Sequence, residues 1–317
     1  MKKFALLFIA LVTVFVVSAC GNGSADKTSG KSKKDTITIK DDLNKEGVNV
    51  PKNPKKVVVF NLGMLDTMDE LGLQDHVAGL PKQSLPKYLS KYKNDKYANT
   101  GSLKEPDFEK VADLDPDLII IAHRQSDSYK EFSKIAPTLY LDDNYTNYVD
   151  TFKHNTNVIG KIFNKENEVK DKLAKIDQSI ADLKKKTSKM NKNGLVVMAN
   201  DGKISAFGSK SRYGFIHDVF GVKPADKNIE ASLHGQSISY EYIAKTNPDY
   251  MFVVDRGTAI GTTSSTKQVV ENDYVKSVNA VKNNHVVYLD SAVWYLSGGG
   301  LESMAQMVKE VKDGIEK

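Results

Sequence analysis

Arginine is rare in this 317-residue chain, and its three occurrences share one kind of position. The sequence contains 45 lysines and arginines, of which only Arg124, Arg212 and Arg256 are arginine. Each follows an apolar, strand-like segment: LIIIAH, ISAFGSKS and YMFVVD, respectively. Arginine carries a fixed fork of donors, stays charged and gives up hydration more readily than lysine. The sequence therefore predicts an anion-binding site built from three guanidinium groups.

The charge on the three arginines indicates what kind of ligand would fit such a site. One arginine about 6 Å from a negative charge gains roughly 3 kcal/mol at an effective dielectric constant of about 20. Without an anion, the three charges repel one another. Their grouping thus favours a multiply charged anion. The alternative is that each arginine forms an ordinary surface ion pair, but the shared placement after strands argues against it.

Further residues are candidates for the same site, because each lies in a loop or next to a predicted strand end: Asn61, Lys104, His123, His234, Trp294 and Tyr295. Two of these residues, His234 and Tyr295, have side chains that could contact a ligand directly. His234 can equally form a hydrogen bond within its loop, and Tyr295 can stack on a ligand or line the pocket. Trp294 beside it fits the aromatic wall that is usual in ligand pockets.

Motifs for other chemistries are missing from the sequence. It contains no G-x-S-x-G elbow, no H-E-x-x-H and no plausible Cys–His pair, so we do not expect an enzyme. The net charge is +5, but the lysines are scattered among acids with no aromatic-interleaved basic stripe, which argues against nucleic acid. A zinc or manganese site would need several histidines and carboxylates, whereas the strand ends carry arginine.

The N-terminal residues predict export. Two lysines precede an apolar run from Phe4 to Val17, which is shorter than the roughly 20 residues of a membrane-spanning helix and fits a signal-peptide core. The small residues before Cys20 resemble the lipobox of bacterial lipoproteins, which implies cleavage there and acylation of this cysteine. The alternative is a secretory peptide with an incidental cysteine. We assign residues 1–19 to the signal peptide and 20–35 to a flexible polar tether.

Two segments of the chain match at a constant offset of 132 residues: FEKVADLDPDLIIIAHR at 108–124 and YEYIAKTNPDYMFVVDR at 240–256. Each predicts a short helix, a Pro-Asp break and a buried parallel strand. A strand–loop–helix segment precedes each of them, beginning at Lys55 and at Leu195, and each of these helices ends at a glycine that suits a C-cap. The pattern indicates two related lobes.

The region between these lobes has a helical pattern. Apolar residues recur there at three- and four-residue steps, namely Val169, Leu173, Ile176, Ile180 and Leu183. We therefore predict an α/β fold in which an N-terminal lobe (36–150) and a C-terminal lobe (190–317), both Rossmann-like, are bridged by one long helix (151–189). The ligand cleft is expected between the lobes, outside the carboxyl ends of the strands. A stiff bridge predicts little movement between the lobes.

The lipobox, the repeated Pro-Asp–strand units, the bridging helix and the three arginines resemble the periplasmic-binding-protein class that serves siderophore, haem and cobalamin ABC importers. Within that class, three pocket arginines are typical of catecholate siderophore binders, and the nearest likeness is to the petrobactin-binding lipoproteins of Bacillus. The resemblance implies that Arg124, Arg212 and Arg256 surround a ferric catecholate. His234 and Tyr295 would ligate iron only if the siderophore leaves sites open. Haem and ferric hydroxamates remain alternatives.

The resemblance also implies partners. Glu109 and Glu241, one per repeat, would dock on an ABC permease dimer that works with an ATPase; alternatively, they only complement the helix dipole. No intrinsic cofactor is implied, because the ferric siderophore is the ligand. We expect a monomer, anchored through lipids on Cys20 to the outer face of the cell membrane in the Gram-positive manner.

Overall fold

The computed structural model describes residues 35–83, 85–262, 266 and 272–316. The predicted signal peptide, Cys20 and all of the tether except Asp35 lie outside these residues. Within the described part, no helix has the length and apolar character that crossing a membrane requires.

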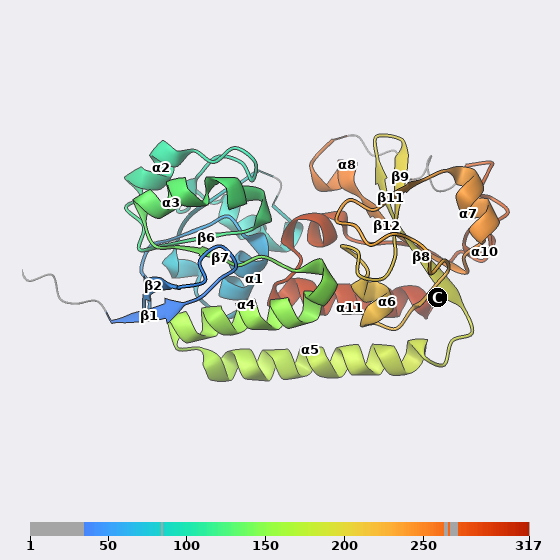
Figure 1. Cartoon of the computed structure of the whole chain (residues 1–317), viewed down its shortest axis with the longest axis horizontal. Helices are drawn as coiled ribbons and strands as arrows, with labels where there is room; N and C mark the ends of the chain where they lie inside the picture. Colours follow the sequence, from blue (N-terminus) through green and yellow to red (C-terminus); the bar gives the residue numbers. More distant parts are fainter. Residues whose placement is uncertain (1–34, 84, 263–265, 267–271, 317) are drawn as a thin grey trace, which may run out of the picture. The chain divides into compact units, whose positions relative to one another are not determined.

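The first sheet has five parallel strands in the order β5-β4-β3-β6-β7, of which β6 and β7 are labelled in Figure 1. They are β3 (Val57–Val59), β4 (Val77–Leu80), β5 (Ala98–Asn99), β6 (Leu118–Ile121) and β7 (Thr138–Tyr140). Side chains alternate along β3, so that Val57 and Val59 pack into one hydrophobic cluster and Val58 into another. Burial on both faces explains why these strands are continuous apolar runs.

Short helices and a hairpin surround this sheet. The helices are α1 (Leu62–Glu70), α2 (Phe108–Asp113) and α3 (Tyr129–Ile135), with 3-10 turns at Gln74–His76, Lys87–Lys93, His123–Ser128 and Tyr145–Asn147. The antiparallel pair β1 (Thr36–Ile39) and β2 (Val48–Pro51) lies at the start of the described chain.

The second sheet is mixed. It has the order β11-β9-β8-β12-β13, with β10 paired to β8. The strands are β8 (Asn193–Asn200), β9 (Lys203–Phe207), β10 (Lys223–Pro224), β11 (Gln236–Ile238), β12 (Tyr250–Asp255) and β13 (Val286–Tyr288). Here β12 is parallel to β8 and β13, whereas β9 is antiparallel to β8 and β11. The helices of this half are α6 (Phe215–Asp218), α7 (Tyr240–Thr246), α8 (Arg256–Ala259), α10 (Asn279–Lys282) and α11 (Leu301–Ile315).

The predicted repeat is confirmed, since α2–β6 and α7–β12 hold equivalent places in their sheets. In both, the strand lies parallel beside the first strand of its half, β3 or β8. The aspartate of each Pro-Asp pair ties the two strands together. Asp117 Oδ2 accepts hydrogen bonds from the backbone amides of Lys55 (2.8 Å) and Lys56 (3.1 Å). Asp249 Oδ2 accepts one from the backbone amide of Asn193 at 2.9 Å.

One long helix bridges the lobes, as predicted, but the predicted bounds of 151–189 are wrong, because two helices occupy this region. They are α4 (Tyr148–Phe163) and α5 (Glu166–Thr187), which pack side by side as a hairpin (Figure 1). The chain reverses at Asn164, whose backbone is left-handed with φ 53° and ψ 45°. Asparagine adopts this conformation more readily than most residues. The apolar stripe did not reveal the break because both helices bury one face.

The bridge between the two halves is α5. Near its start, Lys172 forms an ion pair of 2.6 Å with Glu70 at the end of α1. At its end, the Thr187 hydroxyl donates to the carbonyl of Phe220 in the second half at 2.7 Å. The largest hydrophobic cluster is also continuous across the two sheets, since it includes both Val59 and Val196. The predicted two-lobe α/β fold is confirmed, and the lobes share one core.

Candidate functional site

A cleft of about 1140 Å³ is lined by residues from both lobes, at the carboxyl ends of the parallel strands. Asn61 follows β3, His123 and Arg124 follow β6, Asn200 ends β8 and Arg256 follows β12. This placement agrees with the general rule that open α/β sheets bind ligands at that edge.

All three arginines line the cleft, as predicted. Arg124 lies in the 3-10 turn after β6, and Arg256 is the first residue of α8. These two are equivalent in the repeat. Arg212 reaches the cleft differently, because β9 is antiparallel and its carboxyl end does not lie at the edge shared by β8 and β12. The turn after β9 carries Arg212, whose amide donates to the carbonyl of Ser232 at 3.2 Å.

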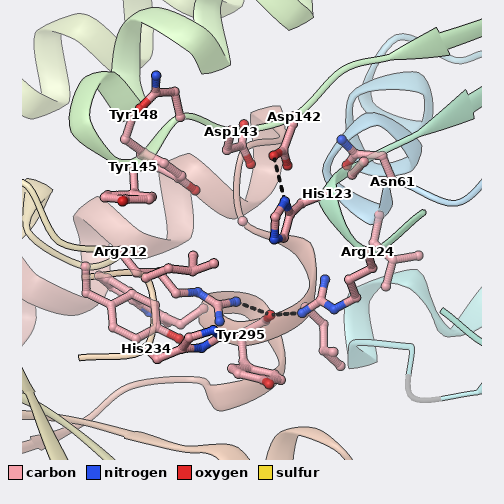
Figure 2. Close-up of a pocket in the computed structure, with 18 of the residues that line it drawn as sticks. Asn61, His123, Arg124, Asp142, Asp143, Tyr145, Tyr148, Arg212, His234 and Tyr295 are labelled. Carbon is pink, nitrogen blue, oxygen red and sulfur yellow. Dashed lines mark hydrogen bonds and ion pairs between the residues drawn. The ribbon is translucent and has the colours of Figure 1, made fainter. Parts of the chain in front are cut away.

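The three arginines converge on one residue, Tyr295. Figure 2 shows Arg124 and Arg212 pointing toward it. The guanidinium carbons of Arg124, Arg212 and Arg256 lie 5.6, 4.5 and 5.7 Å from the centre of the Tyr295 ring. Arg124 and Arg212 donate to the Tyr295 carbonyl at 3.1 and 2.8 Å. Arg256 Nε donates to the phenol oxygen at 3.0 Å. Tyr295 thus supplies a ring face, a carbonyl and a hydroxyl to three cations.

The electrostatics of this group follow from burial and mutual charge. Desolvation, reinforced by the nearby charge of Arg212, lowers the pKa of Arg124. For Tyr295, burial opposes ionisation of the phenol. The hydrogen bond from Arg256 and the charges of all three arginines outweigh burial and lower the pKa of Tyr295. The site therefore favours negative charge at its centre.

Tyr295 lies on a π-helical turn, Val293–Ser297, between β13 and α11. Such turns often mark functional sites. Its neighbour Trp294 points into the core, with 3% exposure. The Trp294 ring stacks on Phe215 with centroids 5.5 Å apart, and its Nε1 donates to Glu310 at 2.8 Å. Trp294 borders the cleft but supports its floor more than it offers a free aromatic face.

The remaining predicted residues also border the cleft, but they differ in whether their side chains are free to contact a ligand. Lys104 and His234 are exposed. Asn61 is buried, and its side chain is already engaged: its oxygen accepts from the amides of Gly63 and Met64 at the start of α1, and its nitrogen donates to the carbonyl of Leu141. The role of Asn61 is therefore to shape the wall of the cleft.

Sequence reasoning missed several residues of the cleft, which come mainly from the segment after β7: Asp142, Asp143, Tyr145 and Tyr148. Tyr148 stacks on Phe215 at 4.4 Å. The segment LDDNYTNY follows the end of a parallel strand, so the rule that predicted Arg124 also applied here. Asn200, whose oxygen accepts from Arg256 Nη1 at 2.8 Å, was missed as well.

Comparison with known proteins places the chain in a family. Residues 57–293 match the model for the periplasmic binding proteins. The chain belongs to the periplasmic binding protein family. Within this family, it is 74% identical over 317 residues to the petrobactin-binding protein YclQ of Bacillus subtilis, covering all of both chains.

Solved structures of periplasmic binding proteins share the fold. The crystal structure of the petrobactin-binding protein YclQ from Bacillus subtilis matches with a TM-score of 0.89 and 75% identity, covering 90% of this chain and 100% of that one. The catecholate-siderophore binding protein VctP from Vibrio cholerae matches with a TM-score of 0.82 and 35% identity, covering 88% and 100%.

The two repeated glutamates hold equivalent positions in the two lobes. Glu109 lies in the first turn of α2 and Glu241 in the first turn of α7, and both are exposed. The hydrogen bond with Ser239 lowers the pKa of Glu241. Both are thus accessible carboxylates, one on each lobe.

Proposed function

We propose that this protein is an extracytoplasmic binding component of an ABC importer and captures an anionic, petrobactin-like ferric catecholate siderophore. The observation that carries the proposal is the convergence of Arg124, Arg212 and Arg256 on one point of the cleft. Three cations held around one centre match a ferric tris- or bis-catecholate, which is trianionic when iron(III) holds three deprotonated catechols. The 74% identity to a protein named for petrobactin supports the choice of siderophore.

The ligand would take over the contacts that Tyr295 now makes. Catecholate oxygens are better acceptors than a carbonyl or a neutral phenol, because hydrogen bonds to charged groups are stronger. Lys104 at the exposed rim would meet a ligand carboxylate. If the siderophore offers iron fewer than six oxygens, His234 and Tyr295 would complete the coordination, since both border the cleft.

The proposed protein and membrane partners would contact parts of the protein outside the cleft. Glu109 and Glu241 would form ion pairs with a permease dimer, one per lobe, while an ATPase drives import. Lipids on Cys20 would hold the protein at the outer face of the membrane. The protein would act as a monomer and perform no covalent chemistry.

Other ligands fit the cleft less well. Ferric hydroxamates are often neutral and would leave three arginines without a charged partner. Haem carries only two propionates. A zinc or manganese role lacks support, because the described residues contain no group of three or more His, Cys, Asp or Glu side chains arranged to hold a metal ion.

A fluorescence titration of the chain lacking residues 1–20 tests the proposal. The single tryptophan, Trp294, would report binding of ferric petrobactin, ferric enterobactin, haem and ferrichrome in parallel. We expect tight quenching by the catecholates. Replacing Arg124, Arg212 or Arg256 with alanine should each weaken binding about 10- to 30-fold, because solvent reduces a Coulomb energy of roughly 3 kcal/mol per arginine.

The control is Lys227→Ala, which removes an exposed positive charge from outside the residues that line the cleft. It should leave the affinity unchanged. Tight binding of ferrichrome or haem that is indifferent to the arginines would refute the catecholate assignment while leaving an importer role open.

A further inference from the structure

The cleft carries negative charge on the side opposite its arginines. Asp142 and Asp143 follow β7 and lie side by side across the cleft from Arg124 and Arg212 (Figure 2). Asp42 also borders the cleft. Among the described residues, neither Asp142 nor Asp143 forms an ion pair with a lysine or an arginine. The cleft is therefore bipolar, with a cationic side and an acidic side.

Within the described structure, the Asp143 carboxyl group lacks hydrogen-bond partners for one of its oxygens. Its Oδ1 atom has no contact with solvent and no hydrogen-bond partner in the described part of the chain. A Cβ atom at Gly299 would overlap the Asp143 carboxylate, so the carboxylate packs directly against that glycine. Burial, together with the charge of Asp142, raises the pKa of Asp143 well above its ordinary value, although Arg212 opposes the effect. A buried acceptor without a partner is rare and calls for a physical reason.

Asp142 is better placed to meet a ligand. Its side chain is 28% exposed, it accepts a hydrogen bond from the Tyr140 hydroxyl at 2.9 Å, and its Oδ2 lies 3.9 Å from His123 Nδ1. Its two polar neighbours are thus a phenol hydroxyl and an imidazole. A carboxylate with spare acceptor capacity remains directed into the cleft.

A purely anionic ligand would gain from the arginines and lose against the Asp142 carboxylate and the acceptor oxygens of Asp143. The arrangement is favourable only if the ligand brings a positive group to the acidic side. We propose that Asp142 and Asp143 form a subsite for a protonated amine of the ligand, separate from its iron-chelating oxygens. The Tyr145 ring, drawn in Figure 2 on the same side, adds an aromatic face that attracts an ammonium group.

An amine fits this subsite better than a metal ion does. Within the described residues, no three His, Cys, Asp or Glu side chains are arranged as metal ligands. A protonated amine within a linker donates through two N–H groups, so it needs only two acceptors at hydrogen-bond distance. Asp142, which is partly exposed, supplies the acceptor that a ligand reaches directly, and Asp143 lies beside it in the lining of the cleft.

This inference rests on the proposed function, because it concerns a second feature of the same ligand. The test uses two ferric bis-catecholate chelates that differ only in the linker, one with a secondary amine and the other with a methylene group in its place. Their affinities are measured by Trp294 quenching for the wild type, Asp142→Asn, Asp143→Asn and the double variant. Asp150→Asn, which changes an exposed aspartate of α4, is the control.

The wild type and the control should bind the amine-bearing chelate about tenfold more tightly than the methylene chelate, in line with one charged hydrogen bond. The aspartate variants should lose this preference, and their affinity for the methylene chelate should stay equal or rise. Because Asp142 is partly exposed, Asp142→Asn remains informative if Asp143→Asn folds poorly.

Three outcomes would overturn the inference. In the first, the wild type binds both chelates equally. In the second, the aspartate variants weaken both chelates alike, which indicates a structural role. In the third, Ca²⁺ displaces the amine-bearing chelate through the same aspartates, which would make the pair a metal site. If the wild type binds neither chelate, the proposed catecholate function itself fails, and the amine subsite fails with it.

Discussion

Arg256 donates a hydrogen bond from Nε to the phenol oxygen of Tyr295, and the two atoms are 3.0 Å apart. Burial works against ionisation of this phenol, but the bond and the three guanidinium charges prevail and lower the pKa of Tyr295. The protein thus holds, at the centre of its anion site, a group that is itself easier to ionise than an ordinary tyrosine. Tyr295 offers the arginines a hydrogen-bond acceptor and a ring face before a ligand arrives.

An ultraviolet titration of tyrosinate should therefore reveal one phenol that ionises below about pH 10, the ordinary value. The pKa of Tyr295 is lower in the folded protein than in the unfolded chain. Ionised Tyr295 therefore stabilises the fold fully at a pH above the unfolded-state pKa, and this stabilisation is lost as the pH falls through the folded-state pKa. Tyr295→Phe should abolish this early ionisation. At neutral pH it should not change the part of the stability that comes from ionisation of the phenol. Tyr274→Phe, at an exposed residue, should keep it. An unchanged titration in Tyr295→Phe would contradict the assignment.

Asn200 is a positioning residue, since its oxygen accepts from Arg256 Nη1 at 2.8 Å. Asn200→Ala should lower affinity for a ferric catecholate by about three- to tenfold, because Arg256 loses one of its two fixed contacts. The loss should vanish in the Arg256→Ala background, as measured by Trp294 quenching in a double-mutant cycle. Additive losses would show that Asn200 acts on the ligand independently of Arg256.

Glu109 and Glu241 give a prediction that separates transport from binding. Replacing both with lysine should reduce siderophore uptake by cells more than tenfold, because two ion pairs become repulsive, while affinity in solution stays unchanged. Glu131→Lys, at an exposed residue of α3, should leave uptake intact. Normal uptake by the double variant would leave only the helix-dipole role, worth about 0.3–1 kcal/mol per site.

Much of this arrangement could be predicted from the sequence because it depends on local rules. Arg124 and Arg256 follow buried parallel strands, and such strand ends meet at one edge. The repeat made the two lobes visible. Arg212 was predicted by the same rule for an incorrect reason, since its strand is antiparallel and only the fold of the following turn brings it to the cleft.

Other features depend on packing that no local pattern contains. The break at Asn164 interrupts neither the apolar stripe nor the polar face of the region. The sequence pattern of α4 and α5 therefore predicted one continuous helix. Tyr295 as the shared partner of three arginines depends on segments 39 to 171 residues away in sequence. The spare acceptor of Asp143 is a property of its surroundings in the fold.

The crossing of α4 and α5 depends on Gly160. A Cβ atom there would lie 3.0 Å from Val169 Cγ2, which is tighter than most Cβ contacts, so the Val169 side chain would have to shift by a few tenths of an ångström. Gly160→Ala should destabilise the protein by about 1–2 kcal/mol, because overpacking outweighs the gain of roughly 1 kcal/mol in helix propensity. Urea unfolding measures the effect. Lys161→Ala, at the exposed neighbouring position, should change stability by less than about 0.5 kcal/mol.

Asp66 joins the two halves of the protein from a fully buried position. It lies on α1, and its carboxylate accepts from the backbone amides of Glu302 (2.9 Å) and Ser303 (2.8 Å), at the start of α11. The Tyr88 hydroxyl is 3.1 Å from the same carboxylate and 2.9 Å from Ser297, on the turn that carries Tyr295. Desolvation raises the pKa of Asp66 to about 7, although these hydrogen bonds oppose the shift.

A raised folded pKa means that the folded protein holds a proton that the unfolded chain releases. The stability contributed by Asp66 should thus be complete below about pH 4 and decline as the pH rises toward and through about 7. The loss should be on the order of 4 kcal/mol by pH 8.

The free energy of unfolding in urea, measured from pH 4 to 8, tests this prediction. Asp66→Asn should remove the decline, whereas Asp113→Asn, at an exposed residue, should keep it. The asparagine variant leaves one backbone amide of α11 without an acceptor, so it should be less stable than the wild type at pH 4 and approach or exceed it at pH 8. Parallel pH profiles for the wild type and Asp66→Asn would show that Asp66 stays ionised in the fold, and that the helix cap, rather than the proton, joins the two lobes.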